Sequence, residues 1–467
     1  MYRELIKQLT ITGFCIFLHS ATKAQNYDCN CSQTFEKMTE KLENNYIAYH
    51  LTKLEIEKEY ESRKLKYKSL TDRTEAQNCS QVLQDFLAFF KDGHLFVTEY
   101  PNFSEEDLAR TKYEIKQNIF NPNIHKVFDS DTIEGYWTDG ISKFMIIKNQ
   151  NANISFEYVA VIVDCDDKTK IGEIKFAVND SKHKYEGFYY TNRYASRYVK
   201  VTPYKDNSLL SIWGGITWGR LNSREEPVYN PTAPGFKKID NKNALLTIPS
   251  FLIDAKDLNQ VLIDNEKELK STNNLIIDIW GNTGGNGIYF DLLSLYYEKP
   301  IHNERGLAIA SDDNIDYFEK FNSNKGQDNP YLSVIKAMKQ NKGKIVPGPD
   351  FGTLEMNPEK TNLKKIVILT DRSNISATET FILHSKAVSD KVITMGDNTG
   401  GVVDYNNINL IKLNCEKHGI YFGYPTFTLN DRIITQGYNK TGIIPDIKIN
   451  NSVKNKIGFV LKYLKNN

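Results

Sequence analysis

The chain has 467 residues, more than one domain usually holds, and its 40% hydrophobic and 12% aromatic residues can build real cores. The net charge is +1, so the composition gives no general affinity for nucleic acid. Composition therefore predicts several folded units and excludes general nucleic-acid binding as the function.

The N-terminus has the pattern of a bacterial secretory signal peptide. Arg3 and Lys7 form a basic start, the apolar run Leu9–Leu18 follows, and small residues surround Ala24. We predict cleavage after Ala24, which makes 1–24 the signal peptide and predicts export to the periplasm or the outside of the cell. The apolar run is short for a membrane span, so an uncleaved anchor is the less favoured alternative. No stable membrane association is expected after cleavage.

Cysteine usage is compatible with export, because exported proteins can keep disulfides. One cysteine lies in the predicted signal peptide, and the others are Cys29, Cys31, Cys79, Cys165 and Cys415. We expect Cys29 or Cys31 to pair with Cys79, and the odd number leaves at least one thiol free or paired between chains. The Cys-x-Cys spacing is not that of a zinc site, so no metal or other cofactor is predicted.

Residues 25–110 are predicted to form a helical segment. Apolar residues recur at helical spacing in 33–45 and more strongly in 74–91, and a strand is expected over 94–98. Gly93 is expected to follow the last turn of the second helix. His94 then lies at a sharp junction, where catalytic groups often occur, although a solvated or core histidine is the default at such a position.

Residues 111–242 are predicted to form an antiparallel β module, barrel or sandwich, with a linker over 221–242. Short alternating runs are separated by turn residues and predict strands over 143–147, 158–163, 173–178, 187–190, 197–201 and 209–213. The aromatic residues of this module are interpreted as its core in preference to a ligand site.

Residues 243–467 are predicted to form an α/β domain with a largely parallel sheet. Strands are expected over 245–249, 275–279, 366–370 and 392–395, and helices over 258–269, 289–297, 380–388 and 453–464. Active sites in such sheets lie in loops at the carboxyl ends of strands. Both the glycine loop 281–287 and Ser376 follow such ends. The glycine loop lacks the register of a dinucleotide-binding motif.

Ser376 lies near the turn from a buried strand into a helix. Free backbone N–H groups at a helix N-terminus favour developing negative charge, and the Ala377 N–H is placed to be half of an oxyanion hole. The simpler interpretation is that Ser376 is only a helix N-cap.

The chain resembles the S41 serine peptidases, which include tail-specific (C-terminal processing) proteases and the tricorn core. The resemblance covers roughly 29–98 and 243–465 and leaves the β module unmatched. It rests on segments in the family's order: DGH at 92–94, LIIDIWGNTGG at 275–285, ILTD with SATE between 368 and 379, GDNTGG at 396–401 and GIIPD at 442–446.

The resemblance implies a crotonase-like (ClpP/crotonase superfold) catalytic domain that hydrolyses peptide bonds. Ser376 would be the acylated nucleophile, with oxyanion N–H groups from Ala377 and from Gly284 or Gly285. Tail-specific members use a Lys base, which the segment 399–402 lacks. Tricorn-like members use His, so the resemblance to that branch makes His94 the base.

Three positions depart from the family pattern. The segment before 442–446 carries Asn439 and no carboxylate, Gly93 precedes the histidine in place of a hydroxyl residue, and Trp280 replaces the usual Arg of the glycine loop. Candidates for the group that orients His94 are therefore Glu379, Asp397, Asp404 and Asn439.

Two functions are carried forward from the sequence. The favoured one is an exported serine endopeptidase that acts on peptides or unfolded proteins. The alternative is a catalytically lapsed S41-like protein that binds peptides or a small apolar ligand. An acyl-CoA enzyme on the same scaffold is weaker, since export removes the chain from CoA. No PDZ-type signature is evident, so the β module is a candidate substrate gate.

Overall fold

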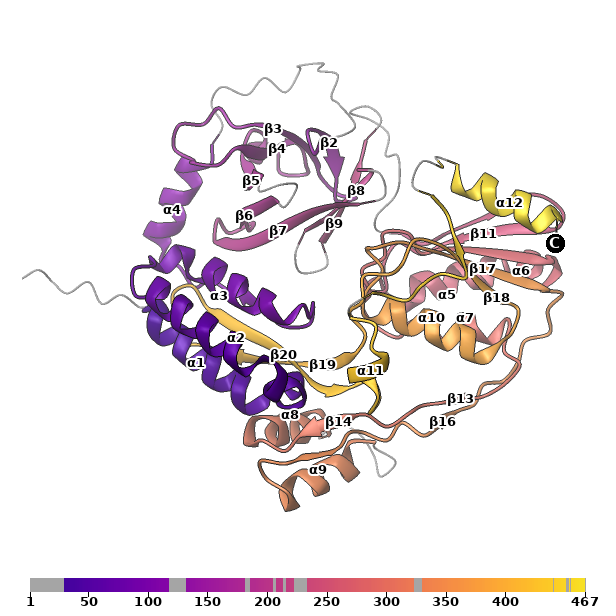
Figure 1. Ribbon diagram of the computed structural model, residues 1–467. Helices are drawn as coiled ribbons and strands as arrows, with labels where there is room; N and C mark the ends of the chain where they lie inside the picture. The colour runs from indigo at the N-terminus through magenta and orange to yellow at the C-terminus, as the bar shows by residue number, and fades with distance from the viewer. Residues whose placement is uncertain are drawn as a thin grey trace, which may run out of the picture.

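The computed structural model describes residues 29–116, 132–180, 185–204, 207–212, 216–221, 233–322, 330–439, 441–450, 453 and 455–466. The predicted signal peptide lies outside these ranges. Across these ranges, the helices are all too short or too polar to cross a membrane. The described chain is a mixed α/β structure (Figure 1).

The C-terminal part is built on a largely parallel sheet. Its strand order is β10 (Gly235–Lys238), β11 (Asn243–Thr247), β12 (Asn274–Asp278), β17 (Lys365–Thr370), β18 (Val392–Gly396) and β21 (Ile447–Lys448). Only the β10–β11 pairing within this described order is antiparallel. The central strands are buried on both faces, which is why their sequences read as continuous apolar runs.

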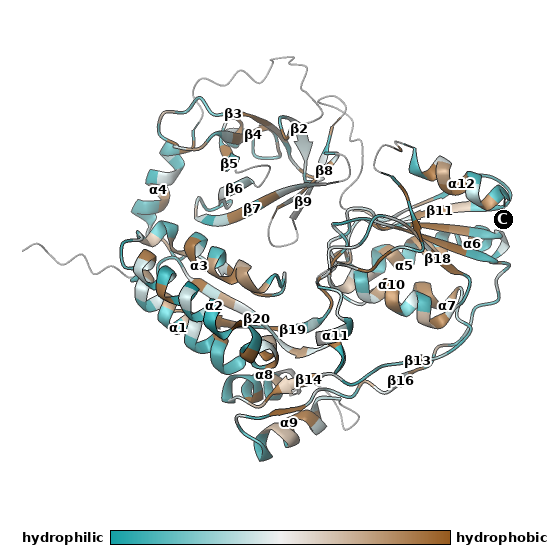
Figure 2. Cartoon of the chain, in the orientation of Figure 1, coloured by the Kyte–Doolittle hydropathy of each residue, from teal (hydrophilic) through white to brown (hydrophobic). Residues whose placement is uncertain are grey.

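Helices cover both faces of this sheet. One core cluster packs the sheet against α5 (Ala255–Asp264), α6 (Glu266–Ser271), α7 (Phe290–Ser294) and α10 (Ala377–Val388). A second cluster packs the opposite face against α12 (Lys456–Asn466). In Figure 2 the strands between these helices are brown, as expected for a three-layer core.

A second sheet joins the N-terminal segment to distant parts of the chain. Strand β20 (Ile420–Thr428) pairs with β1 (Phe96–Glu99), with β14 (Leu307–Ile309) and with β19 (Tyr405–Lys412), while β14 also pairs with β15 (Ile345–Pro347). The N-terminal helices α1 (Cys31–Asn45), α2 (Ile47–Thr71) and α3 (Cys79–Leu87) share a core with β1 and the β19–β20 hairpin. The strand that follows His94 is therefore held by residues more than 300 positions away.

The remaining elements complete this part of the molecule. Helices α8 (Asp312–Asn322) and α9 (Tyr331–Gln340) pack beside β14 and β15, the short α11 (Ile433–Gln436) follows β20, and the ribbon of β13 (Ile301–His302) and β16 (Thr353–Leu354) runs back to the parallel sheet. Figure 1 shows this ribbon as the long connection at the bottom of the view.

An antiparallel barrel lies between these sequence segments. It consists of β2 (Gly135–Thr138), β3 (Lys143–Lys148), β4 (Tyr158–Asp164), β5 (Ile174–Asp180), β6 (Tyr185–Tyr190), β7 (Ser196–Tyr204), β8 (Leu209–Ile212) and β9 (Ile216–Arg220), and β9 returns to pair with β2. Stacked aromatic rings such as Phe144 and Trp218, 3.9 Å apart, fill its interior. Helix α4 (Glu105–Glu114) connects the barrel to β1.

Several local features differ from the expectations. Lys91, with φ 52°, takes the left-handed position after the helical stretch, because the chain turns there through the 3₁₀ segment Ala88–Phe90. Gly93 was therefore the wrong residue for that position. Helix α2 was not anticipated because it is mostly exposed and lacks a clear apolar stripe, as its teal colour in Figure 2 shows.

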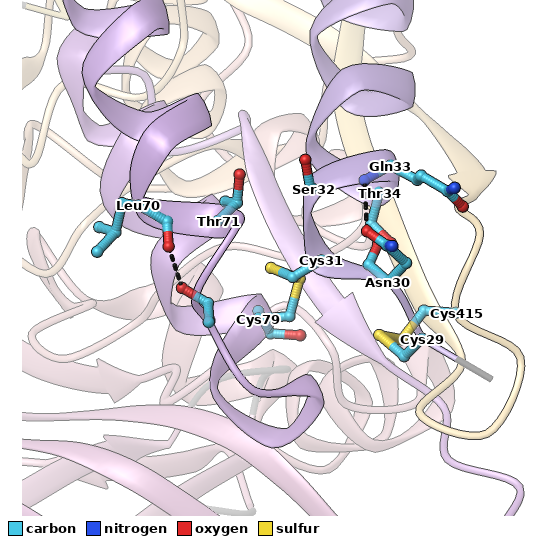
Figure 3. The surroundings of a disulfide bond; sticks show 12 residues. Cys29, Asn30, Cys31, Ser32, Gln33, Thr34, Leu70, Thr71, Cys79 and Cys415 are labelled. Carbon is cyan, nitrogen blue, oxygen red and sulfur yellow. Dashed lines mark hydrogen bonds between the residues drawn. A yellow bond between two sulfur atoms is a disulfide. The ribbon is translucent and has the colours of Figure 1, made fainter. Parts of the chain in front are cut away.

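Two disulfides fix the N-terminal segment (Figure 3). Cys31 bonds to Cys79, which is one of the two pairings left open by the sequence, and Cys29 bonds to Cys415, which was not anticipated. Cys165 is free and half-buried. The Cys29–Cys415 bond ties the residue before the N-cap of α1 to the connection between β19 and β20, so it braces the sheet that carries β1.

Removing the Cys31–Cys79 disulfide by a double change to Ser is expected to lower the free energy of unfolding by about 4 kcal/mol. The bond closes a loop with a sequence separation of 48 residues, and its loss restores entropy to the unfolded chain. Equilibrium urea unfolding measures the change. Cys165→Ser is the control and should stay within about 0.5 kcal/mol of the parent protein. Equal losses of unfolding free energy in the double variant and in Cys165→Ser would contradict the expectation.

Candidate active site

Ser376 lies at the junction between the parallel sheet and α10. The central strand β17 ends at Thr370, a short turn follows, and the helix begins at Ala377. Ser376 has φ 56° and ψ −124°, a conformation that non-glycine residues seldom adopt. Such a backbone costs about 1–3 kcal/mol and persists only when its surroundings hold it, which makes it a signal of function.

Buried polar side chains hold this turn. The Asn374 amide donates to the carbonyl oxygens of Ile279 at 2.6 Å and Asn282 at 3.2 Å, and its own oxygen accepts the Asp371 N–H at 2.8 Å. The Thr378 hydroxyl donates to the Asn282 side chain at 2.8 Å. The turn that carries Ser376 is thus bonded to the glycine loop after β12, and both stand at the carboxyl edge of the sheet.

His94 approaches Ser376 from the second sheet. Its Nε2 lies 2.9 Å from Ser376 Oγ, across a sequence separation of 282 residues. Its Nδ1 lies 2.6 Å from the carbonyl oxygen of Tyr405, the first residue of β19. A carbonyl can only accept, so Nδ1 carries a proton, and in the neutral ring Nε2 then accepts the hydrogen bond from the Ser376 hydroxyl. Neutral imidazole in this tautomer is ready to take the serine proton.

Backbone N–H groups next to Ser376 point to an oxyanion site. Among the described residues, the N–H groups of Ala377 and Gly285 have no hydrogen-bond partner. The Gly284 N–H donates to the Asn282 side chain at 2.9 Å, so Gly285 is the better candidate of the two glycines that were left open. Of the two glycines, only Gly285 keeps a free N–H.

Gly284 instead allows the glycine loop to approach the serine turn. Its φ is +92°, and a Cβ there would lie 2.7 Å from the Ile375 carbonyl oxygen and 3.1 Å from Ser376 Cβ. Both the backbone conformation and the close contact require glycine.

Gly284→Ala is expected to lower peptide hydrolysis about 100-fold, since a displacement of about 1 Å at a reacting group costs that much. The matched control is Gly352→Ala, where φ is +60° but no atom lies within 4 Å of the added Cβ. Both changes strain the backbone by about 1–2 kcal/mol, and only the first pushes on the serine turn. Steady-state kinetics compare the two, and similar activities would contradict this account.

The candidates for an orienting acid do not reach His94. Glu379 is buried and accepts the Thr399 hydroxyl and the N–H groups of Gly401 at 3.0 Å and Val402 at 2.6 Å. Asp397 faces Arg372 and Lys448. Asn439 accepts the Asp404 N–H at 3.3 Å, and Asp404 in turn accepts the N–H groups of residues 438 and 439. All of these expectations are corrected, because the Tyr405 carbonyl occupies His94 Nδ1.

Glu379 has a different structural task. Burial raises the pKa of its carboxyl, while hydrogen bonds from Thr399, from the backbone at Val402 and Gly401, and from the Ser376 backbone oppose that rise. Through these hydrogen bonds, Glu379 holds the segment 399–402, which leads to Tyr405, against the first turn of α10. The carbonyl that orients His94 is thereby positioned from the same helix end as Ser376.

The other departures from the family pattern also have structural reasons. A Cβ on Gly93 would lie 2.9 Å from both terminal carbons of Val402, so a hydroxyl residue does not fit there. Trp280 donates its indole N–H to the Thr370 carbonyl at 2.6 Å, and the Lys456 ammonium lies 3.2 Å from its ring centroid.

Asp92 was overlooked by sequence reasoning, although it is the first residue of the quoted DGH segment. Its Oδ1 accepts the His94 backbone N–H at 2.9 Å, and its Oδ2 accepts the Tyr46 hydroxyl at 2.7 Å. The Tyr405 carbonyl was overlooked because every residue has one. In the ranges described above, clusters of three or more metal-binding side chains are absent.

A serine held at a strained helix start, an imidazole at hydrogen-bond distance and free N–H groups beside them are the arrangement that a serine-type hydrolase requires. Residues 242–449 match the model of peptidase family S41. This match supports a serine-type peptidase related to family S41.

One solved structure supports the fold, and two others are weaker matches. The structure of mature CPAF complexed with lactacystin is 11% identical, covers 93% of this chain and 98% of that chain, and has a TM-score of 0.51. A putative peptidase from Parabacteroides merdae is 16% identical over 92% of this chain and 93% of that chain, with a TM-score of 0.41. The photosystem II D1 C-terminal processing protease is 10% identical over 91% and 94%, with a TM-score of 0.36. No curated protein sequence gave a match.

Proposed function

We propose that this S41-related peptidase is an exported enzyme that cleaves peptides or unfolded proteins through an acyl-enzyme on Ser376, with His94 as general base. The observation that carries the proposal is the 2.9 Å contact between Ser376 Oγ and His94 Nε2, with His94 Nδ1 held by a carbonyl. The match to the peptidase family supports peptides or proteins as the substrate class.

The proposed reaction has two halves. Ser376 Oγ attacks the scissile carbonyl carbon while its proton moves to His94 Nε2, and the oxyanion accepts the N–H groups of Ala377 and Gly285. The intermediate collapses as the C–N bond breaks and His94 returns the proton to the leaving amine. Water then attacks the acyl ester with His94 again as base, releasing the new carboxyl group and Ser376.

The domain assignment belongs to the same proposal. We infer a helical segment at 25–110, the β module with its linker at 111–242, and a crotonase-like catalytic domain of the tricorn-like branch at 243–467. A cavity of about 240 Å³ lies between the His94 segment and the barrel, lined by residues such as Gly93, Val97, Tyr198 and Lys200. The position of this cavity, between the His94 segment and the barrel, supports a role for the barrel in controlling substrate access.

Export is proposed from two observations. Residues 1–24 have the pattern of a signal peptide, and Cys29, Cys31, Cys79 and Cys415 form two disulfides. Disulfides persist mainly in oxidising compartments.

Labelling with a fluorophosphonate probe tests the proposed nucleophile. The folded mature protein should be labelled on Ser376 and not on Ser373, which lies in the same turn but bonds to Asp371. Peptide mass spectrometry locates the label, and heat-denatured protein is the control, because labelling requires the assembled site. A folded protein without label on Ser376 would favour the alternative, a lapsed family member that only binds peptides or an apolar ligand.

A further inference from the structure

The buried carboxylate of Asp92 is bonded to the backbone of His94. Asp92 is only 6% exposed, and both of its oxygens accept hydrogen bonds, from the His94 backbone N–H and from the Tyr46 hydroxyl. Tyr46 lies between α1 and α2, and its ring packs edge-on against Tyr405 at 5.9 Å. Asp92 therefore contacts the His94 backbone and also Tyr46, which packs on Tyr405, the residue whose carbonyl orients the His94 ring.

The surroundings of Asp92 offer it no fixed cation. Tyr405 and Asp404 face it from the segment entering β19, and Tyr198 and Lys200 lie across the adjoining cavity. Lys200 pairs with Glu186 at 3.1 Å, and within the described ranges no Lys or Arg forms an ion pair with Asp92. The pKa of Asp92 is raised, chiefly by burial and also by the nearby Asp404 carboxylate, while the His94 charge and the hydrogen bonds from Tyr46 and the His94 backbone oppose the rise. Its two accepted hydrogen bonds suit the ionised form.

The chemistry of the dyad needs such a charge. When Ser376 attacks, His94 becomes an imidazolium, and a partner carboxylate normally both orients the ring and stabilises this cation. Here the Tyr405 carbonyl occupies Nδ1 and orients the ring, but it carries no full charge. The two tasks are therefore separated between two groups.

We propose that Asp92 is a positioning residue that supplies the negative charge stabilising the His94 imidazolium, with Tyr46 holding it in place. This inference rests on the proposed function of Ser376 and His94. Two groups thus share the work of the usual orienting acid. The Tyr405 carbonyl orients the His94 ring, and the Asp92 carboxylate supplies charge from the backbone side of His94.

Asp92→Asn tests the charge while keeping the shape. We expect kcat/KM for a fluorogenic peptide to fall about tenfold, and the acid limb of its pH profile to move about one unit lower. The sign follows because a lost negative charge makes the imidazolium form only at lower pH. The fall is smaller than for a lost orienting acid, since the carbonyl still fixes the tautomer. Tyr46→Phe should move the limb in the same direction by less.

The control is Asp397→Asn, which removes a carboxylate that faces Arg372 and Lys448 and should leave the limb unchanged. Histidine ¹⁵N NMR on the Ser376→Ala protein, with and without Asp92→Asn, gives a readout that needs no activity. The midpoint of His94 protonation should fall with Asp92→Asn. An unchanged midpoint, or a uniform loss of rate without a limb shift, would overturn the proposal. If Asp92→Asn does not fold, an unmoved limb in Tyr46→Phe overturns it.

The two proposals can fail separately. If Ser376 is not labelled by the probe but the midpoint still moves, the electrostatic pairing of Asp92 with His94 stands and the peptidase mechanism fails. If Ser376 is labelled and the midpoint does not move, the mechanism stands and the role of Asp92 fails.

Discussion

Ser376→Ala is expected to lower kcat for peptide hydrolysis by about 10⁵-fold or more, the size of effect seen when a serine nucleophile is removed. The Ser376 hydroxyl donates to His94 at 2.9 Å and lies beside the free N–H of Ala377. Steady-state kinetics on a fluorogenic peptide measure the loss. Substrate binding should survive, because the change removes only the hydroxyl.

Ser373→Ala is the matched control for this loss. Ser373 lies three residues earlier in the same turn, and its hydroxyl donates to the Asp371 side chain. Its removal should leave most of the activity. Hydrolysis that survived Ser376→Ala would refute the nucleophile assignment, and equal losses in both variants would mean that the turn, and not the hydroxyl, matters.

His94→Ala is expected to lower kcat/KM by about 10⁴-fold and to remove the acid limb of the pH profile. Without the imidazole, the remaining rate should rise with hydroxide concentration. Another histidine cannot supply this limb from α10, because burial lowers the pKa of His384 to about 4. Kinetics across pH 5 to 9 measure both effects.

His302→Ala is the control for the histidine change. His302 is exposed on the β13–β16 ribbon, where its ring bonds to Thr353 at 2.9 Å. It should keep the rate and the pH profile of the parent protein. An acid limb that persisted in His94→Ala would assign the base to another group.

The sequence carried most information where structure is local. The strand before Ser376 is visible as a continuous apolar run because both of its faces are buried. The helix after it and alternating barrel strands such as β6 are visible because burial on one face imposes a period on neighbouring residues. The glycine loop and the serine turn could be placed at one sheet edge because parallel strands share their carboxyl ends. Helix α2 was not predicted, because most of its side chains are exposed and impose no apolar period on the sequence.

The sequence by itself determined a family resemblance, a candidate serine and a candidate histidine, since these depend on residue type and on order along the chain. Tertiary structure alone decided that the two lie 2.9 Å apart, that Gly285 and not Gly284 keeps a free N–H, and that Cys29 reaches Cys415. It also placed a backbone carbonyl, and no acid, at His94 Nδ1. Such contacts join residues hundreds of positions apart through strand register and packing, and a carbonyl common to every residue leaves no mark in the sequence.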